Sequence, residues 1–83
     1  MNLTLAILAS LHNVHPRLLP EPALHVDANS LLPSPVTRAE LQAELASLER
    51  RALIIGVTDA LLGLRKWRLS DSGLAALASS TAA

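Results

Sequence analysis

Apolar residues recur at helical spacing near the start of the chain. This spacing predicts a helix over residues 2–14 with a wide apolar face. Pro16 ends it, because the residue before a proline is pushed out of the helical region. The run has no positively charged segment before it and is too short to span a bilayer, so we expect a first core helix rather than a signal peptide. The apolar positions are Leu5, Leu8 and Leu11, with Ile7 and Ala9 beside them.

All five prolines lie within residues 16–35. Between them, a short helix starting near Glu21 places Leu24 and Ala28 on one face, and a short strand would align Leu24, Val26 and Ala28 equally well. Of the two, we favour a short helix followed by an extended piece.

The clearest signal for a helix begins at Thr37. Thr37 and Glu40 form a capping box, in which each side chain bonds the backbone N–H of the other residue. Val36 and Leu41 stand at the positions of a hydrophobic staple. We therefore predict a helix over residues 37–52. Its apolar stripe consists of Leu41, Leu45, Leu48 and Ala52.

A β-hairpin follows this helix. In its second strand, Trp67 and Leu69 alternate with Lys66 and Arg68, so the first pair is expected in the core and the second pair in solvent. The hairpin consists of a strand over 53–58 (LIIGVT), a turn over 59–63 (DALLG) and a strand over 64–69 (LRKWRL).

A last helix is predicted after Ser70, which is suited to cap it. Leu69 and Leu74 form a second staple. We expect one domain over residues 1–79 and a frayed polar tail over 80–83.

The composition excludes several classes of function but does not identify one. The 83 residues include 19 Leu and 14 Ala but one Trp and no Phe or Tyr, which favours packed helices and leaves few aromatic surfaces for stacking on bases. Seven basic residues balance seven acidic ones, so there is no basic excess of the kind usual in DNA-binding domains. The absence of Cys excludes disulfides, thiol catalysis and Cys-based zinc sites.

Two phrases in the second half of the chain resemble the winged-helix family. The helix ends in LASLERRALI, which follows the family phrase L-x-x-L-x-x-x-x-L-I, and the last helix opens with LSDSG, which follows L-[ST]-x-x-G. The resemblance covers residues 36–78 well and 1–35 by helix order. It implies a mainly α fold with a three-helix core, a two-stranded wing and a C-terminal helix. The chain departs from the family where the proline-rich passage stands in place of the ordinary second helix and tight turn.

The resemblance implies a non-enzymatic DNA-binding module, as in a transcriptional regulator. Residues 37–51 would be the recognition helix and 56–68 the wing. Base readout needs long polar side chains, and on this helix they are Arg38, Gln42 and Arg51. The helix also carries carboxylates that phosphates repel, namely Glu40, Glu44 and Glu49.

The predicted wing has three basic residues. Arg65, Lys66 and Arg68 are suited to contact DNA phosphates. The alternative is a solvated face that keeps an edge strand from aggregating.

The alternative function is protein–protein interaction, as a homodimer or an adaptor. Ala39, Ala43 and Ala46 line the helix face that would meet DNA, and they permit close approach by another helix or pack against the domain's own helices. Leu61 and Leu62 give the hairpin an apolar tip, which is usual where a loop folds back or meets a protein.

Catalysis and metal binding find little support. His12 and His15 are three residues apart, and His25 and Asp27 are the nearest further ligands, but no motif brings them together. The chain has no phosphate-binding glycine loop and no nucleophile motif. We expect no enzymatic activity, no cofactor, no small-molecule substrate, no membrane partner and a cytoplasmic location.

Overall fold

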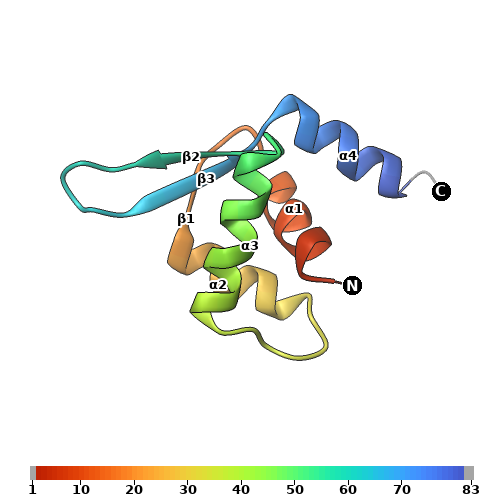
Figure 1. The fold of residues 1–83 in the computed structure, drawn as a ribbon, viewed down its shortest axis with the longest axis horizontal. Helices are drawn as coiled ribbons and strands as arrows, with labels where there is room; N and C mark the ends of the chain where they lie inside the picture. Colours follow the sequence, from red (N-terminus) through yellow and green to blue (C-terminus); the bar gives the residue numbers. More distant parts are fainter. Residues whose placement is uncertain (1, 82–83) are drawn as a thin grey trace.

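The computed structural model describes residues 2–81. The elements are α1 (Leu3–Val14), β1 (Leu19–Pro20), α2 (Glu21–Ser30), α3 (Arg38–Arg50), β2 (Ile54–Thr58), β3 (Arg65–Leu69) and α4 (Asp71–Thr81). Figure 1 shows the β2–β3 hairpin projecting away from the helices, with α4 at the base of the hairpin on the side opposite its tip.

The first helix forms as predicted, and Asn2 caps it. The Asn2 side chain accepts a hydrogen bond from the backbone N–H of Leu5 at 2.8 Å. Helix α1 packs against α2, α3 and α4 and against strand β3. Its buried residues are Ala6, Ile7, Leu8, Ser10 and Leu11.

The proline-rich passage does contain the second helix, so the expectation that this helix is replaced was wrong. The favoured alternative of a helix from Glu21 is confirmed by α2, which buries Leu24 and Ala28. What differs is the connection to α3, which runs over residues 31–37 instead of a tight turn. Asn29 holds this connection by accepting a hydrogen bond from the Val36 N–H at 2.9 Å.

The third helix begins at its predicted cap. The Glu40 N–H donates to Thr37 Oγ1 at 3.1 Å, and the Thr37 N–H donates to Glu40 Oε1 at 3.0 Å. Hydrogen bonds from the Thr37 backbone and then its hydroxyl hold the pKa of Glu40 below its usual value. Leu41, Leu45 and Leu48 are buried as predicted.

The prediction that the helix continues to Ala52 was wrong. The helix ends at Arg50, and Ala52 is exposed with φ 58°, in the left-handed region. Helices commonly end with a residue in this conformation, because it lets the next N–H groups bond the last carbonyls. Here the Leu53 N–H bonds the Leu48 carbonyl at 3.0 Å. Ala52 therefore reverses the chain into β2 instead of extending the apolar stripe.

The sheet has one strand more than the sequence predicted. Its order is β1-β3-β2, and all pairs are antiparallel. The additional strand β1 pairs Leu19 with Trp67 and Pro20 with Lys66. The central strand β3 thus has a neighbour on both sides, and β2 pairs with it in full, from Ile54 opposite Leu69 to Thr58 opposite Arg65.

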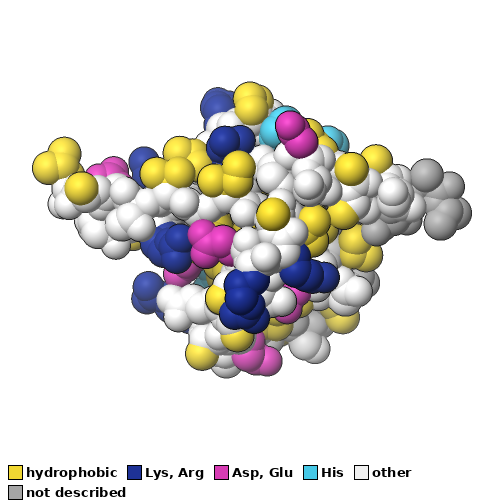
Figure 2. Space-filling view, turned by 45° about the horizontal axis from the view of Figure 1, so that its top comes forward, with side chains coloured by type: hydrophobic (Ala, Val, Ile, Leu, Met, Phe, Trp, Pro, Cys, Tyr) yellow, Lys and Arg dark blue, Asp and Glu magenta, His cyan; other side chains and the backbone are white. Residues whose placement is uncertain are grey.

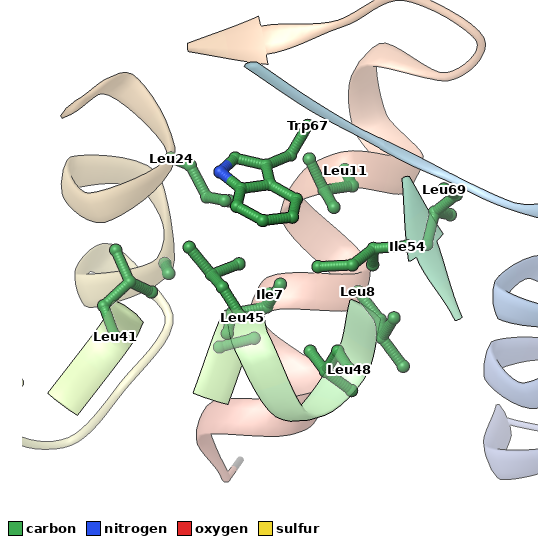
Figure 3. Packing of buried hydrophobic residues seen from close by; sticks show 12 residues of the cluster. Ile7, Leu8, Leu11, Leu24, Leu41, Leu45, Leu48, Ile54, Trp67 and Leu69 are labelled. Carbon is green, nitrogen blue, oxygen red and sulfur yellow. The ribbon is translucent and has the colours of Figure 1, made fainter. Parts of the chain in front are cut away.

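Trp67 lies at the centre of the core, facing inward as its alternation predicted. The residue is 2% exposed, and its ring packs among aliphatic side chains from three helices and the sheet (Figure 3). Leu19, Leu53, Leu74 and Leu77 pack around the margin of this cluster. The buried cluster consists of Ala6, Ile7, Leu8, Leu11, Leu24, Ala28, Leu41, Leu45, Leu48, Ile54, Trp67 and Leu69.

Ser70 caps α4 as predicted. Its hydroxyl accepts a hydrogen bond from the Gly73 N–H at 3.0 Å and donates to the Ala52 carbonyl at 2.6 Å. The helix runs to Thr81, so the backbone of two residues expected in the frayed tail is helical. The rest of that tail, residues 82–83, lies outside the described residues.

We predict that Gly73→Ala destabilises the protein. Helix propensity alone would favour Ala by about 1 kcal/mol. A Cβ at this position, however, would overlap the carbonyl oxygen of Leu53, which is backbone and has little room to move. We expect a net loss of about 1–3 kcal/mol, as for other overpacked sites.

The free energy of unfolding in urea, measured for Gly73→Ala and for the control Ser72→Ala, tests this prediction. Ser72 is exposed on the same turn and should change stability little. A Gly73→Ala protein that is more stable than the parent would show that the contact with Leu53 is unimportant.

Candidate nucleic-acid interface

A crevice opens between α3, the start of α2 and the β2–β3 hairpin (residues 54–69). It has a volume of about 250 Å³. We call it the α3–hairpin crevice. The residues that line it are Glu21, Pro22, Arg38, Gln42, Ala46, Gly63, Leu64, Arg65 and Trp67. Half of the six predicted DNA-binding residues, Arg38, Gln42 and Arg65, therefore meet in one place.

Glu21 is the acceptor at the floor of this crevice. Its side chain is 12% exposed. Its carboxylate accepts a hydrogen bond from Gln42 Nε2 at 3.0 Å and one from the indole Nε1 of Trp67 at 3.3 Å. Arg38 Nε lies 4.0 Å from the same carboxylate. One carboxylate thus holds two of the predicted DNA-binding side chains and satisfies the buried indole N–H.

Arg65 lies across the other wall of the crevice. Its guanidinium stacks on the ring of Trp67, 4.5 Å from the ring centroid, and donates to Glu49 Oε2 at 3.1 Å. Gly56, opposite Trp67 on β2, leaves room for this arrangement. A Cβ at Gly56 would come within 2.5 Å of the Arg65 guanidinium and 2.7 Å of the Trp67 ring.

The other predicted DNA-binding residues lie elsewhere. Lys66 and Arg68 alternate with Trp67 along β3, so they project from the opposite face of the hairpin. Lys66 Nζ lies 3.8 Å from Asp59, whereas the side chain of Arg68 makes no ion pair or hydrogen bond within residues 2–81. Arg51 follows the last residue of α3, 3.9 Å from Glu44. The structure thus divides the predicted set into the crevice, the outer face of the hairpin and the end of α3.

The alanine face of α3 is open. Ala39, Ala43 and Ala46 are all exposed, so the alternative in which they pack against the domain's own helices was wrong. Ala46 also lines the crevice. The small side chains of this face leave the α3 backbone accessible to any large partner, whether nucleic acid or protein.

The tip of the hairpin carries exposed apolar side chains. Leu61 is 96% exposed and Leu62 69% exposed, so the tip does not fold back onto the body. Asp59 shapes the turn by accepting hydrogen bonds from the N–H groups of Leu61 at 2.9 Å and Leu62 at 3.2 Å. Figure 1 shows the tip as the part of the chain farthest from α4.

Acidic and basic side chains are mixed over this side of the molecule. Figure 2 shows Lys and Arg interleaved with Asp and Glu and no broad area of one charge. Four of the predicted basic residues have a carboxylate within 4.0 Å, in the pairs Arg38–Glu21, Arg51–Glu44, Arg65–Glu49 and Lys66–Asp59.

Most of these carboxylate partners were not predicted from the sequence. Glu49 and Glu44 were recognised only as charges that repel phosphate, and Glu21 was recognised only as the start of a helix. The role of Asp59 in the turn could have been predicted, because an Asp directly after an apolar strand commonly accepts hydrogen bonds from the backbone N–H groups of a turn.

Two further features of the described chain bear on its function. No helix within residues 2–81 combines the length and the hydrophobicity that a bilayer-spanning helix needs. Over the same residues, no three His, Asp or Glu side chains gather closely enough to hold a metal ion, and His12 and His15 are part of no such group.

Solved structures share this architecture over nearly the whole chain. RosR of H. salinarum aligns with a TM-score of 0.81 at 16% identity, over 98% of this chain and 70% of RosR. A second structure, a complex designated RosR-S4, aligns with a TM-score of 0.82 at 15% identity, over 98% of this chain and 67% of its own. A Thermoplasma acidophilum protein assigned as a transcriptional regulator aligns with a TM-score of 0.77 at 19% identity, over 93% of this chain and 72% of its own.

These likenesses confirm the winged-helix fold that the two sequence phrases predicted. The hairpin is the wing of this fold, and β1 is the third strand of its sheet. The sequence itself matches no protein-family model, and no curated protein is similar to it.

We predict that protonation of Asp59 loosens the tip of the hairpin. The N–H bonds from Leu62 and Leu61 hold the pKa of Asp59 below its usual value. A carboxyl with a lowered pKa stabilises the folded form above its unfolded pKa, and this contribution is lost as the pH falls through the folded pKa. The backbone amide signals of Leu61 and Leu62 should therefore titrate together, below the usual Asp range.

An NMR pH titration tests this coupling. In Asp59→Asn the amide signals should no longer titrate in this range. Unchanged titration in the variant would mean that another group controls the tip.

Proposed function

We propose that this protein is a non-enzymatic DNA-binding module, and that the α3–hairpin crevice is where it holds duplex DNA. The observation that carries the proposal is the convergence of Arg38, Gln42 and Arg65 beside the open alanine face of α3. In this arrangement α3 would enter the major groove, and the hairpin would lie along the adjacent backbone. The Thermoplasma acidophilum protein, which shares the fold and is assigned as a transcriptional regulator, supports the same role. The role also accords with the cytoplasmic location expected from the sequence.

Phosphate contact requires donors that can leave their present partners. Arg38 has a side chain that is 73% exposed and lies 4.0 Å from its carboxylate, so its ion pair is weak. Arginine binds phosphate oxygens with charge-assisted hydrogen bonds, often two at once. Arg38 and Arg65 approach the crevice from two elements, which would fix the orientation of the duplex relative to α3.

Base discrimination would be modest. Gln42 is the one amide in the crevice, and a Gln amide can pair with the N6 and N7 edge of adenine. Ala39, Ala43 and Ala46 are too short for base hydrogen bonds, although an alanine methyl can contact the methyl group of thymine. We therefore propose weak or loosely specific binding, with most of the affinity from phosphates.

Protein–protein interaction remains the alternative function, and the exposed tip favours it. Leu61 and Leu62 present large apolar side chains to solvent at the end of a hairpin. Together with the alanine face, they offer a surface for a second copy or an adaptor. Light scattering over a range of concentrations distinguishes the homodimer, because a monomer at every concentration excludes it.

We predict that Arg38→Ala and Arg65→Ala each weaken binding to a fluorescently labelled duplex of mixed sequence. Each variant removes one phosphate contact, so the slope of log K against log salt should become shallower by about one unit. Anisotropy at several salt concentrations measures both effects.

Arg68→Ala is the matched control, because Arg68 lies on the same strand but on the opposite face. It should leave affinity and slope nearly unchanged. If Arg68→Ala weakens binding and Arg65→Ala does not, the crevice is the wrong surface. Absence of binding by the parent protein at low salt would contradict a DNA-binding function.

A further inference from the structure

Every long polar donor in the α3–hairpin crevice already lies beside a carboxylate of the protein. Gln42 donates to Glu21 and Arg65 donates to Glu49, whereas Arg38 lies 4.0 Å from Glu21. DNA phosphates carry the same kind of acceptor and the same sign of charge. A phosphate entering the crevice must therefore displace these carboxylates or share their donors.

The two carboxylates differ in what else they hold. Glu21 is 12% exposed and also accepts the indole N–H of the buried Trp67, so its displacement would leave that N–H without its acceptor. Glu49 is 39% exposed, and its side chain has one partner, Arg65, within residues 2–81. Arg65 can thus exchange Glu49 for a phosphate, and the released Glu49 carboxylate can be solvated because it is partly exposed.

The structure positions the Glu49–Arg65 pair tightly. The Arg65 guanidinium lies over the Trp67 ring, and Gly56 leaves the space in which the pair meets. Any side chain at Gly56 would meet the Glu49 carboxylate at 3.0 Å as well as Arg65. The guanidinium therefore stays within reach of both Glu49 and the open crevice, instead of extending into solvent.

We propose that Glu49 sets the affinity of this protein for the nucleic-acid backbone, by competing with phosphate for Arg65. This inference rests on the proposed DNA-binding function. Glu49 occupies Arg65 in the free protein, so a phosphate can bind this guanidinium only by displacing Glu49. The affinity for any duplex is thereby lowered. The contacts of α3 with the bases then contribute a larger share of the binding free energy.

Replacement of Glu49 by Gln tests the proposal. The Gln side chain keeps the shape and can still accept a hydrogen bond from Arg65, but it carries no charge. We expect Glu49→Gln to bind a duplex of mixed sequence about three- to tenfold more tightly at low salt, with a slope against log salt that is about one unit steeper.

Asp27→Asn is the matched control for net charge. It makes the same change in charge, and Asp27 lies on α2 outside the crevice, with no side-chain partner within the described chain. It should raise affinity much less than Glu49→Gln. An equal gain in affinity in the two variants would mean that net charge alone explains the effect, and would overturn the proposal.

The role of Arg65 is tested by a double variant. Because Glu49 acts through Arg65, Glu49→Gln should have little effect in an Arg65→Ala background. An undiminished gain in that background would overturn the proposal. Thermal unfolding of every variant confirms that the fold is kept.

Failure of this inference and failure of the function are distinguishable. If the parent binds DNA and Glu49→Gln binds no better, the inference is wrong and the DNA-binding function stands. If neither parent nor variant binds at low salt, both are wrong. If only Glu49→Gln binds, Glu49 does suppress phosphate binding, and the parent protein has another function.

Discussion

The burial of Trp67 is the constraint on which the rest of the structure depends. It is the only aromatic side chain in a core of Leu, Ile and Ala, and it lies on β3, the strand to which both β1 and β2 pair. Its indole N–H needs an acceptor, which Glu21 provides at the first residue of α2. Because the same carboxylate holds Gln42 on α3, one buried ring joins the sheet, two helices and the floor of the crevice.

The surface around that ring is balanced rather than basic. The carboxylates Glu21, Glu44, Glu49 and Asp59 come from three different parts of the chain, and each lies beside a basic residue. Exposed pairs of this kind contribute little to stability. Their larger effect is on what the surface can bind, because an anion that approaches any of these four basic residues would compete with a carboxylate already in place.

The fold was predictable wherever the signal is local. The capping box at Thr37, the Ser70 cap and the alternation around Trp67 all depend on residues a few positions apart, and all three were confirmed. Features set by distant residues were not predictable. The strand β1 has two residues and exists because Leu19 meets Trp67, and the left-handed turn at Ala52 depends on where β2 must begin. For the same reason, the candidate basic residues could be named but their carboxylate partners could not.

The stacking of Arg65 on Trp67 also has a spectroscopic consequence. With one Trp and no Tyr in the chain, near-ultraviolet absorption and fluorescence of the protein come from a single indole. That indole is shielded from water, lines the crevice and touches both a guanidinium and a carboxylate. Its emission therefore reports on the charge and occupancy of this one place, without an attached dye.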